Sequence, residues 1–260
     1  MPLSHDPLDG YVVHFTRGND SKSAEGARQR GADGNSLPAT LKWLNEIDDT
    51  GYRVSLSILW DGHVQATTYA MGIADDVPEV EASHRSACFS ATRLDKLAQL
   101  IKTRSLYGVG FSQDVVAAAG GRSVQYLDSC GTDATALRKR IEAQRRAGVN
   151  VGNPLWTKTP FIDGSKGSAW EEEWRVPGGL RFEPDDVAFV FLPEDLHDNA
   201  RAFFEEHRQA HTGPAYLCRY IDPRWDAARI KKTLVEPVPA PAAPHPVVPP
   251  ASPFARGSRW

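Results

Sequence analysis

Residues 170–175, with the sequence Trp-Glu-Glu-Glu-Trp-Arg, crowd three carboxylates between two indoles. Tryptophan is highly buried on average, whereas glutamate is rarely buried without a partner. If this run is a strand, its alternation aims Glu171 and Glu173 to one side. Two carboxylates on one side are unfavourable without a cation or a hydroxyl-bearing ligand, and Arg175 is the nearest counter-charge. The run therefore predicts either a catalytic carboxylate site or an edge strand with a structural Glu–Arg pair.

The composition limits the class of protein. With 260 residues and 41% hydrophobic residues, the chain can bury a full core. Its net charge of −3 gives no global positive field that would favour nucleic acid or an anionic membrane. No apolar stretch is long enough for a membrane span, and the N-terminus lacks the pattern of a signal peptide. We therefore expect a cytoplasmic protein with no membrane partner.

The metal-ligating residue types are scattered along the chain. Cys88, Cys130 and Cys218 share no metal-type spacing, and we expect them to be reduced thiols in the core. The histidines also lack the spacing of a ligand set. The sequence predicts no metal site.

Periodicity and turn residues predict a series of strands and helices. Strict alternation over 53–59 predicts a half-buried strand. Two glycines in the strand expected over 106–112 indicate that a ligand or another backbone approaches closely. A helix with an apolar stripe over 94–101 is expected to be capped by Ser90 or Thr92. The other expected strands are 11–16, 87–90, 123–127, 170–175, 187–192 and 215–221, and the other expected helices are 37–44, 113–119, 134–147 and 195–207.

Two segments differ in composition from the rest of the chain. Residues 17–36 are polar and Gly-rich, and a loop of that length is typical of a lid or a binding loop. From residue 236 onward the chain is rich in Pro, Ala and Val, a composition that cannot build a core. We expect a single domain over 1–235 and a disordered tail over 236–260.

The helix expected over 134–147 is strongly basic. Such a charge run is most often a solvated helix face, and the alternative is a nucleic-acid contact. Its cationic residues are Arg138, Lys139, Arg140, Arg145 and Arg146.

Four short motifs occur in a fixed order along the chain. They are His14-Phe15-Thr16, Cys88-Phe89-Ser90, the run from Tyr107 to Ser112, and Glu171-x-Glu173-Trp174-Arg175. In this order they resemble the AbiGi-type abortive-infection family over about residues 11–192. The spacer between Tyr107-Gly108 and Gly110-Phe111 is shorter than in that family, and the 17–36 insert and the proline-rich tail also depart from it.

The same elements are similar to the His, aromatic and Glu order of ADP-ribosyltransferases of the diphtheria-toxin type. This similarity implies an α+β fold with an ADP-ribosyltransferase-like split β-sheet core and peripheral helices, in which the motif strands converge on a cleft between two small sheets. It implies transfer of ADP-ribose from NAD, the co-substrate, to a nucleic-acid or protein acceptor. The family resemblance implies a phage-defence or toxin–antitoxin effector with a possible cognate antitoxin.

Three residues have catalytic roles under this resemblance. Cleavage of the nicotinamide–ribose bond gives the ribose oxocarbenium character, so Glu173 would accept a hydrogen bond from the ribose 2′-hydroxyl and stabilise the transition state. Glu171 would orient the acceptor or take its proton. Tyr107 would stack on the nicotinamide ring, with Gly108 beside it allowing the dinucleotide to lie against the backbone.

The resemblance also implies a set of NAD-binding residues. His14, within the motif that it shares with Phe15 and Thr16, would donate to a ribose hydroxyl. Arg17 would meet the pyrophosphate, and Arg175 is either a phosphate ligand or a structural partner of the glutamates.

Several alternatives remain open at this stage. His14 could be a satisfied core histidine, and Tyr107 could fill the core. The whole chain could be a non-catalytic antitoxin or regulator that keeps the fold and binds a partner. An RNA 2′-phosphotransferase or an NAD glycohydrolase on the same fold would share the NAD site and differ in the acceptor.

Overall fold

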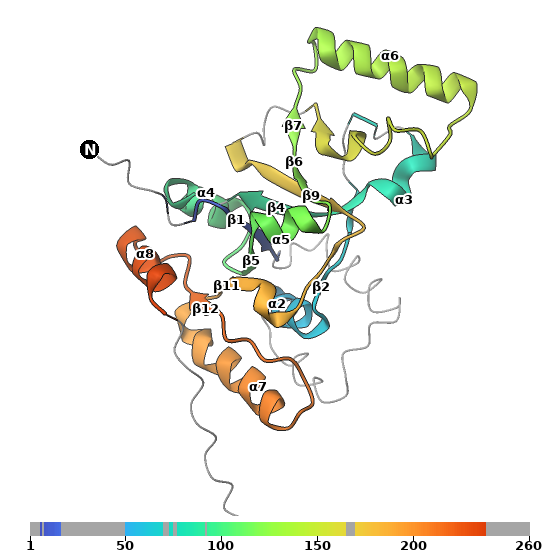
Figure 1. Ribbon diagram of the computed structural model, residues 1–260. Coiled ribbons are helices and arrows are strands. Elements are labelled where there is room, and N and C mark those ends of the chain that lie inside the picture. The colour runs from blue at the N-terminus through green and yellow to red at the C-terminus, as the bar shows by residue number, and fades with distance from the viewer. Residues whose placement is uncertain are drawn as a thin grey trace, which may run out of the picture.

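The structure is a computed structural model that describes residues 6, 8–16, 50–69, 73–74, 77–91, 93–164 and 170–237. A mixed eight-stranded sheet lies at its centre (Figure 1). All neighbouring strands are antiparallel except the pair β11 and β12, which is parallel. The strand order is β12 (Arg219–Ile221), β11 (Val187–Phe191), β5 (Gly108–Ser112), β1 (Tyr11–Phe15), β4 (Arg85–Ala91), β9 (Glu173–Pro177) and β6 (Arg122–Ser123), with β3 (Thr68–Tyr69) also paired to β4.

Two small sheets and several helices complete the described fold. One small sheet pairs β10 (Leu180–Arg181) with β2 (His63–Val64), and the other pairs β7 (Gln125–Tyr126) with β8 (Ile162–Asp163). The α-helices are α2 (Thr50–Asp61), α3 (Glu81–His84), α4 (Leu94–Thr103), α5 (Gln113–Ala118), α6 (Thr132–Ala147), α7 (His197–Gln209) and α8 (Ala227–Val235), and the 3-10 helices are η2 (Pro78–Val80), η3 (Thr159–Phe161), η5 (Pro184–Asp186) and η6 (Glu194–Leu196).

Alternate side chains of the sheet build one core on each face, as strand alternation requires. On one face, Val12, Val109 and Val190 pack with α2 and α7. On the other face, Val13 and Phe189 pack with α4 and α8. The mixed sheet with helices on both faces agrees with the expected α+β class.

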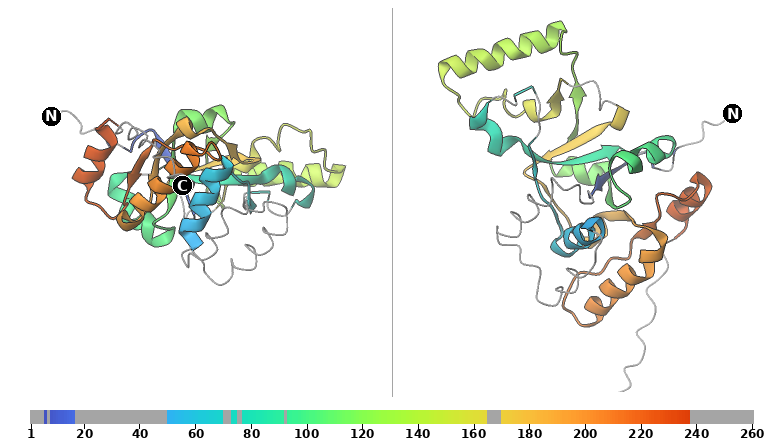
Figure 2. Two further views of the ribbon diagram at one scale, coloured as in Figure 1. Left: turned by 90° about the horizontal axis from the view of Figure 1, so that it is seen from below. Right: turned by 180° about the vertical axis from the view of Figure 1, so that it is seen from behind.

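A third cluster of buried side chains lies at the end of the molecule that carries α6 (Figures 1 and 2). Ala134 and Ile141 of α6 pack in it with Trp156 and with Val80 at the end of η2. This cluster holds α6 against the segments around α3 and η3, at the opposite end of the molecule from α7 and α8.

The prediction of a strand over 53–59 is wrong, because this segment lies within helix α2. Tyr52, Leu56 and Leu59 are buried at spacings of four and three residues, which is the period of one helix face. Val54, which belongs to the alternating set, is 37% exposed. The apolar residues of this segment fit both the two-residue period of a strand and the period of a helix face. Packing of one helix face against the sheet selects the helix.

Most other expected elements are confirmed, with different bounds. The strand expected over 123–127 is divided between β6 and β7, which pair in different sheets. The strand expected over 215–221 is shortened to β12. Cys130 is exposed, so the expectation of a core thiol is wrong for this residue. The helix expected over 37–44, the 17–36 loop and the tail beyond residue 237 lie outside the described residues.

The N-terminus of α4 is capped by a residue distant in sequence. The carboxylate of Asp6 accepts hydrogen bonds from the backbone N–H of Leu94, at 3.0 Å, and from that of Leu8, also at 3.0 Å. Ser90 was expected to be the cap, but the N-cap position is Arg93, which makes no side-chain capping bond. Thr92, the other expected cap, lies outside the described residues.

Two buried histidines tie segments together through hydrogen bonds to backbone carbonyls and, for His84, to a side-chain hydroxyl. His84 lies 2.7 Å from the Thr159 hydroxyl through Nε2 and 2.9 Å from the Val80 carbonyl through Nδ1. His197 lies 2.9 Å from the Leu192 carbonyl through Nε2. Burial lowers the pKa of both imidazoles, and the backbone hydrogen bonds offset only part of this effect.

No helix among the described residues is long and apolar enough to cross a bilayer.

Replacing Asp6 by Ala should lower the free energy of unfolding by about 1 kcal/mol, the usual cost of losing a side-chain cap. Chemical denaturation of the two proteins measures the difference. Asp185→Ala, at an exposed position, is the matched control and should change stability by less than about 0.5 kcal/mol. Equal effects of the two substitutions would contradict the capping role.

The melting temperature should fall as the pH is lowered from about 7.5 to about 5.5. The folded-state pKa values of His84 and His197 lie below the ordinary value of about 6.5, so below that pH the unfolded chain binds more protons and folding loses free energy. Replacing His84 by Gln should flatten this pH dependence, whereas replacing the exposed His211 by Gln should leave it unchanged. A pH dependence that is the same in all three proteins would contradict the assignment.

Candidate functional site

The acidic run does not form one continuous strand. Glu172 has a φ of 48°, so the chain turns before β9 begins at Glu173. The Glu172 carbonyl accepts a hydrogen bond from the N–H of Ala91 at 3.2 Å. This turn breaks the alternation on which the sequence argument depended. Glu171 and Glu173 consequently have different arginine partners.

Glu173 lies in a hydrogen-bonded network with Arg175 and Tyr126. Arg175 Nε donates to Oε1 of Glu173 at 2.8 Å, and Arg175 Nη2 donates to Oε2 at 3.2 Å. The Tyr126 hydroxyl also donates to Oε2, at 3.1 Å. A carboxylate offers about four acceptor positions, so these three bonds leave about one of them open.

Arg175 is shared between two carboxylates. Its Nη2 donates to Oδ2 of Asp163 at 2.8 Å, and its Nη1 donates to the Pro160 carbonyl at 3.0 Å. The side chain of Arg175 is 5% exposed and that of Glu173 is 14% exposed. The guanidinium and its two carboxylate partners are therefore largely buried.

The pKa values in this network shift in the direction that the charges require. Burial lowers the pKa of Arg175, but the bonds to Glu173 and Asp163 outweigh burial and raise it overall. Burial raises the pKa of Tyr126, and the adjacent Glu173 carboxylate raises it further. Arg175 therefore remains charged, and Tyr126 remains a neutral hydrogen-bond donor.

Glu171 is paired with Arg104, at the end of α4. Arg104 Nε donates to Oε2 of Glu171 at 3.1 Å, and Arg104 Nη2 makes a shorter contact with the same oxygen. Glu171 is buried and Arg104 is partly exposed. The pair fastens the end of α4 to the segment before β9, which is a structural role.

His14 spans an opening between two strands of the central sheet. The pairing of β1 with β4 includes Val12 and Val13 only, whereas β1 remains paired with β5 to its end. Beyond Val13, the Nδ1–H of His14 donates to the Cys88 carbonyl at 2.8 Å. Burial lowers the pKa of His14, and this hydrogen bond opposes the shift. The side chain satisfies a carbonyl of β4 where the strands separate.

His14 and Glu173 lie on opposite faces of the sheet. Val13 is in register with Ser90, and Ser90 is in register with Glu173, so these three residues share one face. His14, next to Val13, projects to the other face, where its ring contacts Phe89 at 5.6 Å between centroids. The expected convergence of His14 and Glu173 on a cleft between two small sheets is therefore not met, since their strands belong to one sheet.

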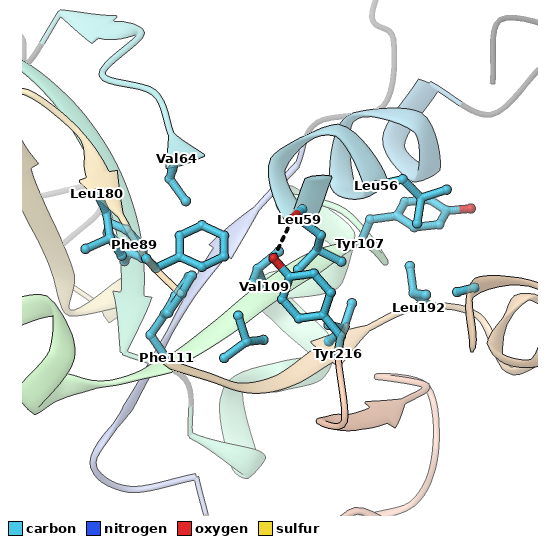
Figure 3. Close-up of a cluster of buried hydrophobic side chains, with 14 of the residues drawn as sticks. Leu56, Leu59, Val64, Phe89, Tyr107, Val109, Phe111, Leu180, Leu192 and Tyr216 are labelled. Carbon is cyan, nitrogen blue, oxygen red and sulfur yellow. Dashed lines mark hydrogen bonds between the residues drawn. The ribbon is translucent and has the colours of Figure 1, made fainter. Parts of the chain in front are cut away.

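The ring of Tyr107 lies in the core. It is 8% exposed and belongs to the same cluster as Leu56 (Figure 3). A Cβ added to Gly51 of α2 would lie 2.5 Å from this ring, so α2 packs directly on it. The ring is therefore covered by α2, which disagrees with the expected stacking on nicotinamide.

The two glycines of β5 are required by side chains rather than by a ligand. A Cβ on Gly108 would lie 2.7 Å from Cγ1 of Val13, and one on Gly110 would lie 2.5 Å from the ring of Phe189. Neighbouring strands thus place side chains over both positions. The sequence signal for a close approach was correct, but the approaching groups belong to the chain itself.

The rest of the first motif also has structural contacts. Phe15 stacks on Phe191 with ring centroids 6.1 Å apart. The buried Thr16 hydroxyl donates to the Gly51 carbonyl at 3.0 Å and lies 3.0 Å from the Ser55 hydroxyl, which ties β1 to α2. Arg17 lies outside the described residues.

Sequence reasoning missed two members of the Glu173 network, Tyr126 and Asp163. Tyr126 lies within the strand expected over 123–127, and Asp163 lies outside every expected element, with no motif at either position. Both residues belong to the small sheet formed by β7 and β8. A parallel pairing between segments so distant in sequence leaves no local signal.

A surface hollow of about 410 Å³ lies at the C-terminal end of α2, away from these residues. Its lining includes the aromatic residues Trp60, Phe182 and Tyr216 and the charged residues Asp61, Arg181, Glu183 and Asp186. None of the expected site residues lines it. Within the described ranges, no three His, Cys, Asp or Glu residues gather in a way that could hold a metal ion.

Comparison of the chain with known protein families, with curated proteins and with solved structures gave no match.

Replacing Tyr107 by Ala should lower the free energy of unfolding by about 3–5 kcal/mol, as for other large buried aromatics. The cause is the cavity left against α2. Denaturation of the variant measures the loss, and Tyr126→Ala, which lies outside this core cluster, is the comparison. A loss below about 1 kcal/mol for Tyr107→Ala would show that the ring is not packed in the core and would restore it as a ligand-stacking candidate.

Proposed function

We propose that the protein transfers ADP-ribose from NAD to a macromolecular acceptor, with Glu173 as the carboxylate that acts on the ribose. The observation that carries this proposal is the partly exposed Glu173 carboxylate, held by Arg175 and Tyr126 with about one acceptor position open. The order of the sequence motifs supplies the reaction class.

The charges around Glu173 fit this chemistry. Loss of nicotinamide gives the ribose positive character in the transition state, so a fixed carboxylate stabilises that state more than the ground state. Arg175 divides its hydrogen bonds between Glu173 and Asp163. These bonds, together with the one from the Tyr126 hydroxyl, keep the Glu173 carboxylate oriented before substrate binds.

The proposal assigns different roles to the other motif residues than the sequence suggested. His14 bridges the opening between β1 and β4, Tyr107 supports α2, and Glu171 anchors the end of α4. These residues shape the sheet that positions β9. Ser90 is buried and lies in register with Glu173 on the same face of the sheet.

A second candidate function is a non-catalytic regulator or antitoxin that binds a partner. The specific observation in its favour is that Glu171 and Glu173 each have an arginine partner. Such pairs occur in purely structural networks. In that case Glu173 would stabilise the fold and would not act on a substrate.

Glu173→Gln should slow nicotinamide release from NAD by about 100-fold or more, while changing NAD affinity by less than about tenfold, because the lost charge matters mainly in the transition state. Release of nicotinamide and NAD titration measure the two effects, and thermal unfolding shows whether the variant keeps its fold.

Glu171→Gln is the matched control, since it removes the other paired carboxylate of the same run. It should retain most of the turnover if Glu171 is structural. Equal rates for wild type and Glu173→Gln would refute the role of Glu173. A wild-type protein that neither binds NAD nor releases nicotinamide would favour the non-catalytic candidate.

A further inference from the structure

The cationic side chains of helix α6 are exposed, and Arg138 also donates from Nη1 to the Ser129 carbonyl at 2.6 Å. The five basic positions named above for this helix are exposed, whereas Ala134 and Ile141 are buried in the third core cluster. Lys139 and Arg146 are seven residues apart, which places them on one line along the helix. That line faces away from the two buried residues, and Arg138 and Arg140 flank it.

The ion pairs that the described residues show on this face involve one acidic side chain, Glu142. Glu142 is ion-paired with Arg146 at 3.0 Å and with Arg145 at 3.7 Å, and Asp133 lies in the first turn. The segment from Arg122 to Asp163 contains seven Lys or Arg and four Asp or Glu, a net charge of +3. Because the whole chain has a net charge of −3, the remainder carries −6. The positive charge is thus concentrated in the part of the chain that includes α6.

The position of α6 leaves its basic face accessible. The helix lies at one extremity of the molecule in all views, away from α7 and α8 (Figures 1 and 2). The helix spans about 12 Å from Arg138 to Arg146 at 1.5 Å per residue, a length that covers several phosphates of a nucleic-acid strand.

We propose that the exposed face of α6 binds the phosphate backbone of a nucleic acid. Four of the five cations are arginines, whose planar guanidinium groups pair with phosphate through two hydrogen bonds. The helix contains no aromatic residue that could stack on a base. The binding is therefore directed at phosphates and is independent of base sequence.

An acidic protein partner fits this face less well. Stable protein interfaces depend on buried aromatic or aliphatic anchors. The exposed side of α6 carries charged and small residues, and its longer aliphatic side chains, Leu137 and Ile141, belong to the packed side. Charge alone is the feature that a partner can recognise here, which suits a polyanion.

This inference rests on α6 alone and does not require the proposed activity at Glu173. The binding measurement contains no NAD, so its failure and the failure of the proposed transfer reaction are distinguishable. If both hold, the nucleic acid is the candidate acceptor class.

The test measures fluorescence anisotropy of a labelled single-stranded RNA and of a labelled DNA duplex with the full chain. The triple variant K139Q/R140Q/R146Q removes three charges from α6. The variant K96Q/K102Q/K231Q removes three charges from exposed positions on α4 and α8 and has the same net charge. Poly-L-glutamate serves as the acidic competitor, and thermal unfolding verifies that both variants keep their fold.

We expect wild-type affinity for the RNA to fall about 100-fold between 50 and 200 mM salt, the change for about five phosphate contacts on a single strand. The α6 variant should bind at least about tenfold more weakly than wild type at the lower salt, and the control variant within about twofold. The probe that the wild-type protein binds with the higher affinity, RNA or duplex DNA, identifies the form of nucleic acid. Equal losses in both variants, no binding of either probe by wild type, or displacement by poly-L-glutamate at equal charge would overturn the proposal.

Discussion

The buried guanidinium of Arg175 is the interaction on which this end of the structure depends. It joins β9 to β8 through Asp163, fixes Glu173, and reaches the Pro160 carbonyl before β8. A buried charge without partners would cost several kcal/mol, so the surrounding segments must supply both carboxylates and the carbonyl. The position of Glu173 is consequently determined by a network that links three segments of the chain.

The central sheet places the two ends of the motif series on different faces. Val13, Ser90 and Glu173 are in register across three strands and therefore lie on one face of the sheet. His14 follows Val13 and lies on the other face, because successive residues of a strand alternate. His14 donates to the Cys88 carbonyl at the point where the pairing of β1 with β4 stops. The candidate site is thus a carboxylate network on one face, supported by a histidine bridge on the other.

Local patterns predicted the strands and helices whose burial follows a single period. The alternating and apolar runs became β1, β4, β5 and β11, and the apolar stripe at 94–101 became α4. The prediction of a strand over 53–59, within α2, was wrong because the apolar residues of this segment fit the periods of both a strand and a helix. The prediction of one strand over 170–175 was wrong in part because Glu172 adopts a positive φ. Nothing in a run of three glutamates predicts that conformation.

The sequence by itself determined the mixed class of the fold, the concentration of basic residues on one helix, and the presence of carboxylates that need partners. These properties follow from composition and from period, which are local. Tertiary structure alone decided which partners those carboxylates have, which face of the sheet each motif residue occupies, and that Tyr107 is covered by α2. Pairing and register join residues far apart in the chain, so no local pattern contains them.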